Sequence, residues 1–279
     1  MKEVRIQNEY VEAVVSQQGA EVISFKRKDN GIETIWSRDP AYWTNCNPIL
    51  FPYTGPLKDG HYEYNGKTYE LGQHGFARRA VFEFDGIQED RATLSLTYNE
   101  ETMKVYPFRF RITVNYRLEG YKIINSYTIS NLDECDLPFS LGFHPAFNCP
   151  LTEDGKYEDY RIEFEVHEDL HHKEKDLTEG DSFDLEHNLV SGSFFYDDHQ
   201  LKSRWSQLTD GKHTIRVGNE GFATLGFWRK TDTTPFMCIE PWFPDSDLKK
   251  KAFFRDDKLN DLLPPGEEFK CQYYFELVK

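Results

Sequence analysis

Residues 108–118 read Phe-Arg-Phe-Arg-Ile-Thr-Val-Asn-Tyr-Arg-Leu, with an apolar side chain at every even position and a polar one at every odd position. This alternation has the period of a β-strand, in which successive side chains point to opposite faces. It predicts a strand with one face on a core and one face in solvent. Glu119-Gly120 then marks a tight turn, and the apolar alternation that runs from Tyr121 to Ile129 predicts the partner strand of a hairpin.

The same period of two returns around residues 94–98 and 162–166, and no 12-residue stretch carries an apolar stripe of helical spacing. The 22 Phe, 16 Tyr and 5 Trp also favour pleated surfaces. Turn-forming residues separate the strand patterns, at Asp29-Asn30-Gly31, Lys58-Asp59-Gly60, Asn65-Gly66, Asp210-Gly211 and Pro264-Pro265-Gly266. The sequence therefore predicts an all-β chain, a large antiparallel β-sandwich in which residues 1–279 form a single domain.

Charge and composition exclude several classes of protein. The 279 residues carry 33 Lys and Arg against 48 Asp and Glu, a formal charge of −15, which argues against a nucleic-acid partner. No apolar run reaches the roughly 18–20 residues that a membrane span needs, and the first residues lack the apolar core of a signal peptide. Five cysteines without a Cys-x-x-Cys pair fit a reducing compartment. We expect a cytoplasmic protein without membrane contact.

Two strongly polar segments interrupt the strand pattern. We expect residues 153–184, with the charged run 167–176, to form a solvated connection or excursion, because charge runs of this kind are usually exposed. Residues 245–261 are interpreted as a surface loop, with one short helix as the alternative.

The first of these segments contains His167-Glu168-Asp169-Leu170-His171, which matches the H-E-x-x-H pattern of zinc proteases. That chemistry needs both imidazoles on one face of a helix. The motif instead continues directly from the alternating run 161–166, so we interpret it as a solvated loop and predict no metal site.

Four other polar residues stand out. His74 and Arg78, in Gln73-His74-Gly75-Phe76-Ala77-Arg78, fall where the chain turns between two strand patterns. His144 precedes a proline, which restricts it to an extended backbone, and Glu240 repeats the arrangement before Pro241. Glu240 is either the salt-bridge partner of an arginine such as Arg78 or a general base with a tuned pKa.

These residues are suited to sugar chemistry. Flat rings such as Trp228, Trp242 and Phe147 can face the C–H surface of a pyranose, while His, Arg and Asp side chains bond its hydroxyls. A glycosidase needs two carboxylates on either side of the scissile bond. One Glu and two His favour proton transfer on a single sugar instead.

Several short motifs together resemble the aldose 1-epimerase (galactose mutarotase) family, in its LacX-type branch. They follow the family's order along nearly the whole chain: Gly19-Ala20-Glu21, Ile35-Trp36, Pro48-Ile49-Leu50-Phe51-Pro52, Gln73-His74-Gly75-Phe76-Ala77-Arg78, Gly142-Phe143-His144-Pro145, Cys238-Ile239-Glu240-Pro241-Trp242 and Pro265-Gly266-Glu267. The resemblance implies a mutarotase-like supersandwich, an aldose substrate, and catalysis without a metal or organic cofactor. We expect a monomer or weak homodimer.

Site roles follow from the same resemblance. Glu240 is similar to the family's base for the C1 hydroxyl, His144 to the acid for the ring oxygen, and His74 to a second sugar-binding histidine. Arg78 looks like a substrate-binding arginine, and Asp198 like a hydroxyl-binding aspartate, with Asp197 as the alternative.

One position departs from the family pattern, because Gly55-Pro56 stands where related chains often have Gly-Arg. A non-catalytic carbohydrate-binding protein and a hexose-6-phosphate 1-epimerase are therefore kept as alternatives. Two adjacent residues on a strand point to opposite faces, so we expect only one of Arg78 and Arg79 to enter the cleft, and a free aldohexose to be preferred over its 6-phosphate.

Overall fold

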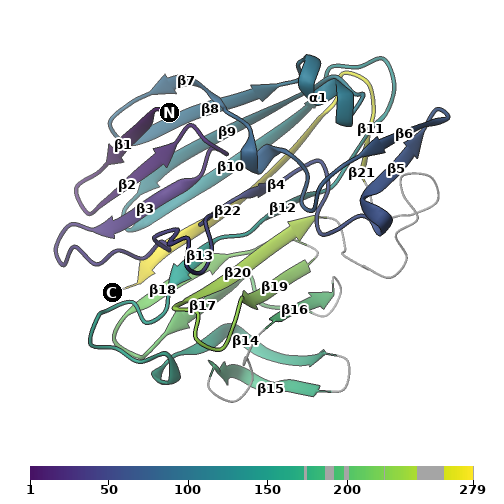
Figure 1. Cartoon of the computed structure of the whole chain (residues 1–279). Helices are drawn as coiled ribbons and strands as arrows, with labels where there is room; N and C mark the ends of the chain where they lie inside the picture. Colours follow the sequence, from purple (N-terminus) through teal and green to yellow (C-terminus); the bar gives the residue numbers. More distant parts are fainter. Residues whose placement is uncertain (173–174, 186–191, 198–200, 223, 244–260, 279) are drawn as a thin grey trace.

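A computed structural model describes residues 1–172, 175–185, 192–197, 201–222, 224–243 and 261–278 (Figure 1). Its largest sheet has nine antiparallel strands. Their spatial order is β15 (Lys175–Asp184), β14 (Arg161–His172), β17 (Trp205–Thr209), β18 (Thr214–Gly218), β22 (Glu268–Val278), β10 (Lys122–Asn131), β9 (Phe110–Glu119), β8 (Arg91–Thr97) and β7 (Glu83–Ile87).

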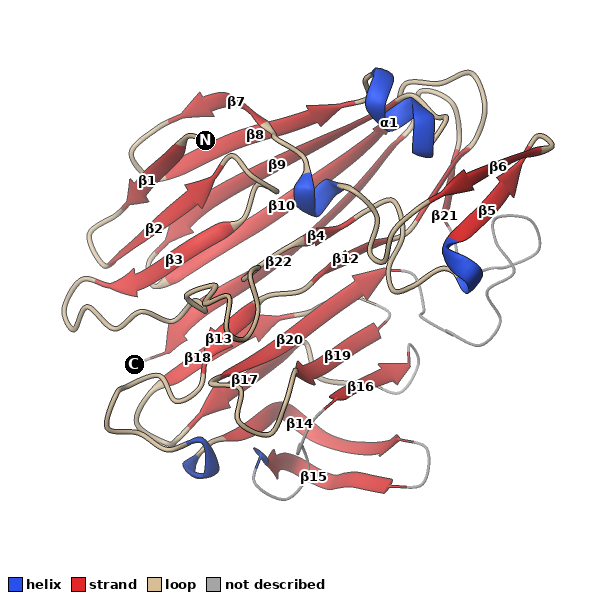
Figure 2. Ribbon diagram, viewed as in Figure 1, coloured by secondary structure: helices blue, strands red, loops and turns tan. Residues whose placement is uncertain are grey.

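Two smaller sheets lie across one face of this large sheet (Figure 2). One is formed by β1 (Glu3–Gln7), β2 (Val11–Ser16) and β3 (Val22–Arg27). The other has the order β16 (Gly192–Asp197), β19 (Thr224–Arg229), β20 (Phe236–Phe243), β12 (Leu141–Phe143) and β4 (Ile49–Leu50), with β13 (Ala146–Asn148) also paired to β20. Two short pairs complete the strands: β11 (Leu137–Phe139) with β21 (Asp261–Leu263), and β5 (His61–Tyr64) with β6 (Lys67–Glu70).

Aromatic rings fill the space between the two layers. Phe143 on β12 lies 4.1 Å from Tyr127 on β10, and Phe227 on β19 lies 5.4 Å from Phe183 on β15, measured between ring centroids. These contacts join the six-stranded sheet to the nine-stranded one, so the predicted all-β sandwich is confirmed.

Helices are few and short. The described ones are α1 (Glu100–Val105), which is capped by the side chain of Asn99, and the 3₁₀ helices η1 (Lys58–Gly60), η2 (Ala77–Arg79) and η3 (Tyr157–Asp159). No helix in the described ranges has the length and apolar character that a membrane crossing requires.

The hairpin predicted from residues 108–129 is confirmed. Strands β9 and β10 pair antiparallel, with Lys122 opposite Glu119, and Gly120 turns the chain at φ 56°. The even positions of β9 are buried in the core, as the alternation requires. The predicted turn at Asn65-Gly66 likewise joins β5 to β6.

The prediction for the polar segment 153–184 is wrong in its main part. Residues 161–184 form the long hairpin β14–β15 at one edge of the large sheet. Backbone hydrogen bonds to a neighbouring strand do not need an apolar side-chain pattern, so a charged run can continue a strand at an edge. The register shifts between Glu163 and Glu168, and Val166 in this irregular stretch is exposed where the alternation predicts burial. The segment 245–261 lies outside the described residues, except for Asp261.

Candidate active site

A cavity of about 320 Å³ opens against the six-stranded sheet. Its volume is within the range of small-molecule sites. It is lined by Trp43, Gly55, Pro56, Gln73, His74, Arg78, His144, Trp228, Lys230, Glu240 and Trp242. The wall thus combines three indole rings, two imidazoles, two cations and one carboxyl group.

Glu240 reaches this cavity because of its position on β20. Side chains alternate along the strand, so Glu240 and Trp242 share the cavity face while Ile239 points into the core between the sheets. Only 1% of Glu240 is exposed. It lies opposite Gly226 on β19, which leaves the neighbouring strand without a side chain beside the carboxylate.

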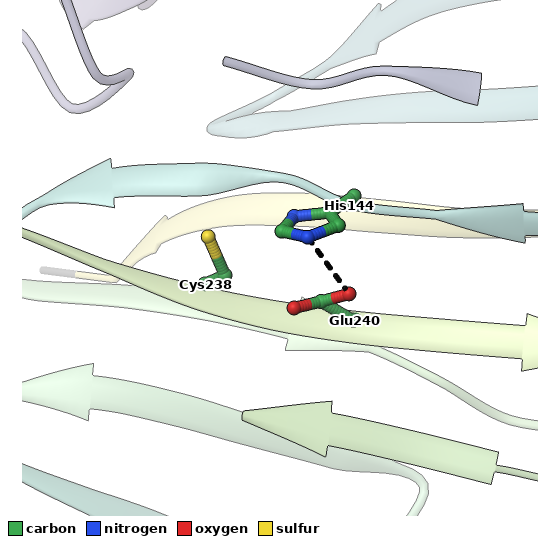
Figure 3. Close-up of side chains that lie close together, drawn as sticks. All are labelled: His144, Cys238 and Glu240. Atoms are coloured by element: carbon green, nitrogen blue, oxygen red, sulfur yellow. Dashed lines mark ion pairs between the residues drawn. The ribbon is translucent and has the colours of Figure 1, made fainter. Parts of the chain in front are cut away.

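His144 comes to the same place from the end of β12, which pairs with both β20 and β4. Its backbone N–H donates to the carbonyl of Pro48 at 3.2 Å, and Pro145 fixes the direction in which the chain leaves. His144 is 7% exposed, and its Nε2 lies 3.3 Å from Oε2 of Glu240 (Figure 3). An acid and a base are therefore in direct reach of one another.

Burial shifts the pKa of each partner toward its neutral form. Burial raises the pKa of Glu240 well above its ordinary value, and a hydrogen bond from the Trp242 side chain offsets part of this rise. Burial, followed by the charge of His74, lowers the pKa of His144 well below its ordinary value. A protonated Glu240 beside a neutral His144 and a Glu240 carboxylate beside a His144 imidazolium differ only in the position of one proton. The pair can thus exchange a proton internally without changing its net charge.

His74 is held in a strained conformation. Its φ is 65°, in the left-handed region that a histidine rarely adopts. The next residue must be glycine, since a Cβ on Gly75 would lie 2.1 Å from the carbonyl oxygen of Phe51. The backbone N–H of Gly55 donates to Nδ1 of His74 at 3.0 Å. Its Nε2 lies 3.1 Å from the side-chain amide of Gln73, so both ring nitrogens have a partner at the cavity wall.

Arg78 lies half-buried in η2, and burial, followed by the charge of Arg79, lowers its pKa. Arg79 is exposed and does not line the cavity. The prediction that one of the two enters the cleft is confirmed, although its reason is wrong because the two residues are in a 3₁₀ helix. No ion pair between Glu240 and Arg78 occurs in the described structure, whereas the contact with His144 does.

Indole rings surround the acid–base pair. Trp43 and Trp228 lie 4.8 Å and 5.2 Å from His144, and Trp242 lies 5.8 Å from His74, between ring centroids. Phe147, in contrast, does not join them. It lies opposite Met237 on β20, on the core side of the sheet, and packs 5.1 Å from Phe275.

This placement corrects the expectation for Phe147, since a fully buried ring between the sheets does not face a ligand in the cavity. Asp198 lies outside the described residues. Asp197 ends β16, and its side chain is likewise outside the described part.

Sequence reasoning missed three cavity residues, Trp43, Gln73 and Lys230. The signal for Lys230 was available, because it follows Trp228 by two positions and such residues share a face of a strand. Its Nζ donates to the carbonyl oxygen of Tyr42. Trp43 lies in an irregular segment, where no periodicity indicates the direction of a side chain.

The H-E-x-x-H motif is not helical and lies on strand β14. Glu168 is fully buried, and its Oε1 accepts backbone N–H bonds from Lys202 at 2.9 Å and Ser203 at 2.6 Å. His167 is exposed. These two hydrogen bonds attach β14 to the segment that contains Lys202 and Ser203, so Glu168 of the motif has a structural role.

Comparisons with known proteins agree on one group. A sequence model of the family described as Aldose 1-epimerase matches residues 2–253. The plasmid-encoded Protein LacX of Lactococcus lactis subsp. lactis is 33% identical over 277 residues, with 91% of this chain and 92% of LacX covered. A galactose mutarotase related enzyme from Lactobacillus acidophilus superposes with a TM-score of 0.90 at 30% identity, over 100% and 98% of the two chains. A galactose mutarotase-like protein from Lactobacillus casei gives 0.85 at 27% identity, over 99% and 100%.

Proposed function

The chain belongs to the aldose 1-epimerase family, and on that premise we propose that it interconverts the α and β anomers of a free aldohexose. The observation that carries the proposal is the buried contact of 3.3 Å between Nε2 of His144 and Oε2 of Glu240, at the wall of a cavity of sugar size. General acid and base catalysis needs two such groups within reach of one substrate.

Glu240, as carboxylate, takes the proton of the C1 hydroxyl, while His144, as imidazolium, gives a proton to the ring oxygen. The C1–O5 bond breaks, and the open-chain aldehyde rotates about C1–C2. Closure on the other face returns both protons to their starting positions. The shifted pKa values support these roles. Burial favours a protonated Glu240 beside a neutral His144. Transfer of that one proton from Glu240 to His144 gives the carboxylate and the imidazolium that the reaction uses.

The rest of the cavity supplies binding. Trp43 and Trp228 offer flat apolar faces to a pyranose, and the side chains of His74, Gln73 and Arg78 offer hydrogen-bonding groups to its hydroxyls. Fixing the sugar in this way places O1 and O5 near the pair, which is the contribution of orientation to the rate.

Polarimetry on freshly dissolved α-glucose and α-galactose tests the proposal. We expect the protein to accelerate the decay of optical rotation over buffer. Absence of acceleration with several aldoses would contradict it. Calorimetric binding of a hexose without anomerisation would instead favour a carbohydrate-binding protein that has lost turnover, the alternative suggested by Pro56.

A second candidate substrate, a hexose 6-phosphate, is favoured by two cations of the cavity. Arg78 and Lys230 line it, and the carboxyl group in the wall, Glu240, is biased toward its neutral form by burial. The cavity is therefore locally positive in a chain of charge −15. A kcat/KM for glucose 6-phosphate well above that for glucose would assign the phosphorylated sugar as the substrate.

A further inference from the structure

Three possible metal ligands meet beside the cavity, two of them in its wall. His144, Cys238 and Glu240 each offer one donor atom, and these atoms all lie within 4.8 Å of one another (Figure 3). All three side chains are buried. The proposed proton transfer uses His144 and Glu240 and leaves the thiol of Cys238 without a role.

The strand geometry explains why the three meet. Cys238 and Glu240 are two positions apart on β20 and so point to the same face. His144 precedes β13, whose Ala146 lies opposite Cys238. Two of the three ligands are thus on one strand, and His144 lies in the two-residue connection between β12 and β13, both of which pair with that strand.

The donor set is one that thiophilic divalent cations prefer. A thiolate, an imidazole and a carboxylate suit Zn²⁺ and its heavier analogue Cd²⁺, whereas Mg²⁺ and Ca²⁺ need oxygen ligands. Tetrahedral zinc with bonds of 2.0–2.3 Å brings its donors to about 3.5 Å apart. The donor atoms of the cluster lie within 4.8 Å of one another, so a bound ion would draw the Cys238 and Glu240 side chains closer together.

We propose that a thiophilic divalent cation, Zn²⁺ or Cd²⁺, binds to His144, Cys238 and Glu240 and thereby blocks the cavity. His144 and Glu240 line the cavity, so the ion enters from there and its fourth position faces the sugar site. The bound ion occupies the lone pairs that the acid and base need for proton transfer. Cation and sugar consequently exclude one another, a consequence that rests on the proposed function.

The binding test uses the whole chain and Cd²⁺, whose bond to a thiolate absorbs in the ultraviolet. We expect one equivalent of Cd²⁺ to give this band in the wild type. Cys238→Ser and Cys238→Ala should lose it and bind Cd²⁺ at least tenfold more weakly. Cys149→Ser is the matched control, because Cys149 is equally buried but lies outside the cluster.

Two results would overturn the site. One is a Cys238 variant, folded by circular dichroism, that keeps the band, and the other is a Cys149 variant that loses it. Both serine variants replace a buried thiol by a hydroxyl, so a shared loss of structure would affect them alike, and Cys238→Ala provides a second test without a buried hydroxyl.

The inhibition test measures anomerisation in increasing Zn²⁺, for each variant relative to its own metal-free rate. We expect inhibition of the wild type that a chelator reverses and that excess sugar relieves, with an inhibition constant at least tenfold higher for Cys238→Ser. Equal inhibition of both proteins would contradict the proposal. If no preparation anomerises any sugar, the proposed function fails, but the Cd²⁺ titration still decides whether the cluster binds metal.

Discussion

Glu240 and His144 meet in a buried contact of 3.3 Å, and the proton transfer proposed for this pair is the step that single substitutions can test. Glu240→Gln keeps the size of the side chain and removes its capacity to accept a proton. We expect turnover to fall by roughly 10²–10⁴, with KM little changed, because a general base acts mainly in the transition state. His144→Asn should behave in the same way. Polarimetry at saturating and limiting sugar separates the two constants.

The matched control is His167→Asn, which removes an exposed imidazole of the H-E-x-x-H run. Its turnover should equal that of the wild type. A His167 variant that loses activity, together with a Glu240 variant that keeps it, would move the catalytic site away from the cavity.

The pH dependence of kcat/KM follows from the same pair. The active form carries one proton, so activity is lost on the acid side when the pair takes a second proton and on the alkaline side when it loses its last one. The lowered pKa of His144 moves the acid limb below the ordinary histidine value, and the raised pKa of Glu240 moves the alkaline limb far above the ordinary glutamate value. We expect a broad plateau across neutral pH. A profile with its acid limb at or above the ordinary histidine value would contradict this assignment.

At the scale of elements, β12 and β20 are held at a fixed separation by a glycine. A Cβ on Gly142 would lie 2.8 Å from both Cγ2 of Thr54 and Cδ1 of Trp242. Gly142→Ala should therefore displace the indole that bonds to Glu240, lowering turnover and costing about 1–3 kcal/mol of stability. Turnover and thermal melting together measure both effects.

Gly86→Ala is the control for this substitution, since a Cβ on Gly86 of β7 meets nothing within 4 Å. It should leave turnover unchanged and be neutral or slightly stabilising. If Gly142→Ala melts and turns over like Gly86→Ala, the close packing of β12 on Trp242 has no part in holding Glu240.

Sequence reasoning identified elements and sites where a short-range rule applies. Alternation located β9 and β10, and a proline after His144 and Glu240 marked the two residues that the fold brings to 3.3 Å. It failed where direction depends on a distant partner. Phe147 points into the core because β13 pairs with Met237 of a strand some 90 residues later, a register that no local pattern contains.

The charged hairpin β14–β15 and the cavity residue Trp43 show the same limit. A strand at the edge of a sheet can be polar, because its neighbour supplies the backbone hydrogen bonds, so residues 167–176 gave no strand signal. Trp43 lies in an irregular stretch, and its place beside His144 follows only from the packing of the whole wall. These positions depend on tertiary contacts, which the local pattern of a single sequence does not reveal.

For the molecule as a whole, the buried pair makes folding stability depend on pH. Above the ordinary pKa of glutamate, Glu240 ionises in the unfolded chain but keeps its proton in the folded one, because burial raises its folded pKa. The folded state then binds more protons, so stability falls as pH rises toward that raised value. His144 acts on the acid side. Its lowered folded pKa means that the unfolded chain binds the extra proton below the ordinary histidine value, and stability falls there with decreasing pH.

Glu240→Gln should therefore raise the melting temperature at pH 7–8 while lowering turnover, because an amide needs no proton to stay neutral when buried. Each kcal/mol gained corresponds to roughly 2–4 °C for a chain of this size. The gain should become small near pH 4, where Glu240 is mostly protonated in the unfolded chain as well, whereas the acid limb that belongs to His144 should persist. Glu165→Gln is the opposite control. Hydrogen bonds from Arg204 lower the pKa of Glu165 to about 2, so this variant should lose stability at neutral pH. Melting curves of the three proteins from pH 4 to pH 8 measure these differences. A Glu240→Gln variant that melts at a lower temperature than the wild type at pH 8 would contradict the prediction. It would show that Glu240 stabilises the fold as an ionised ion-pair partner.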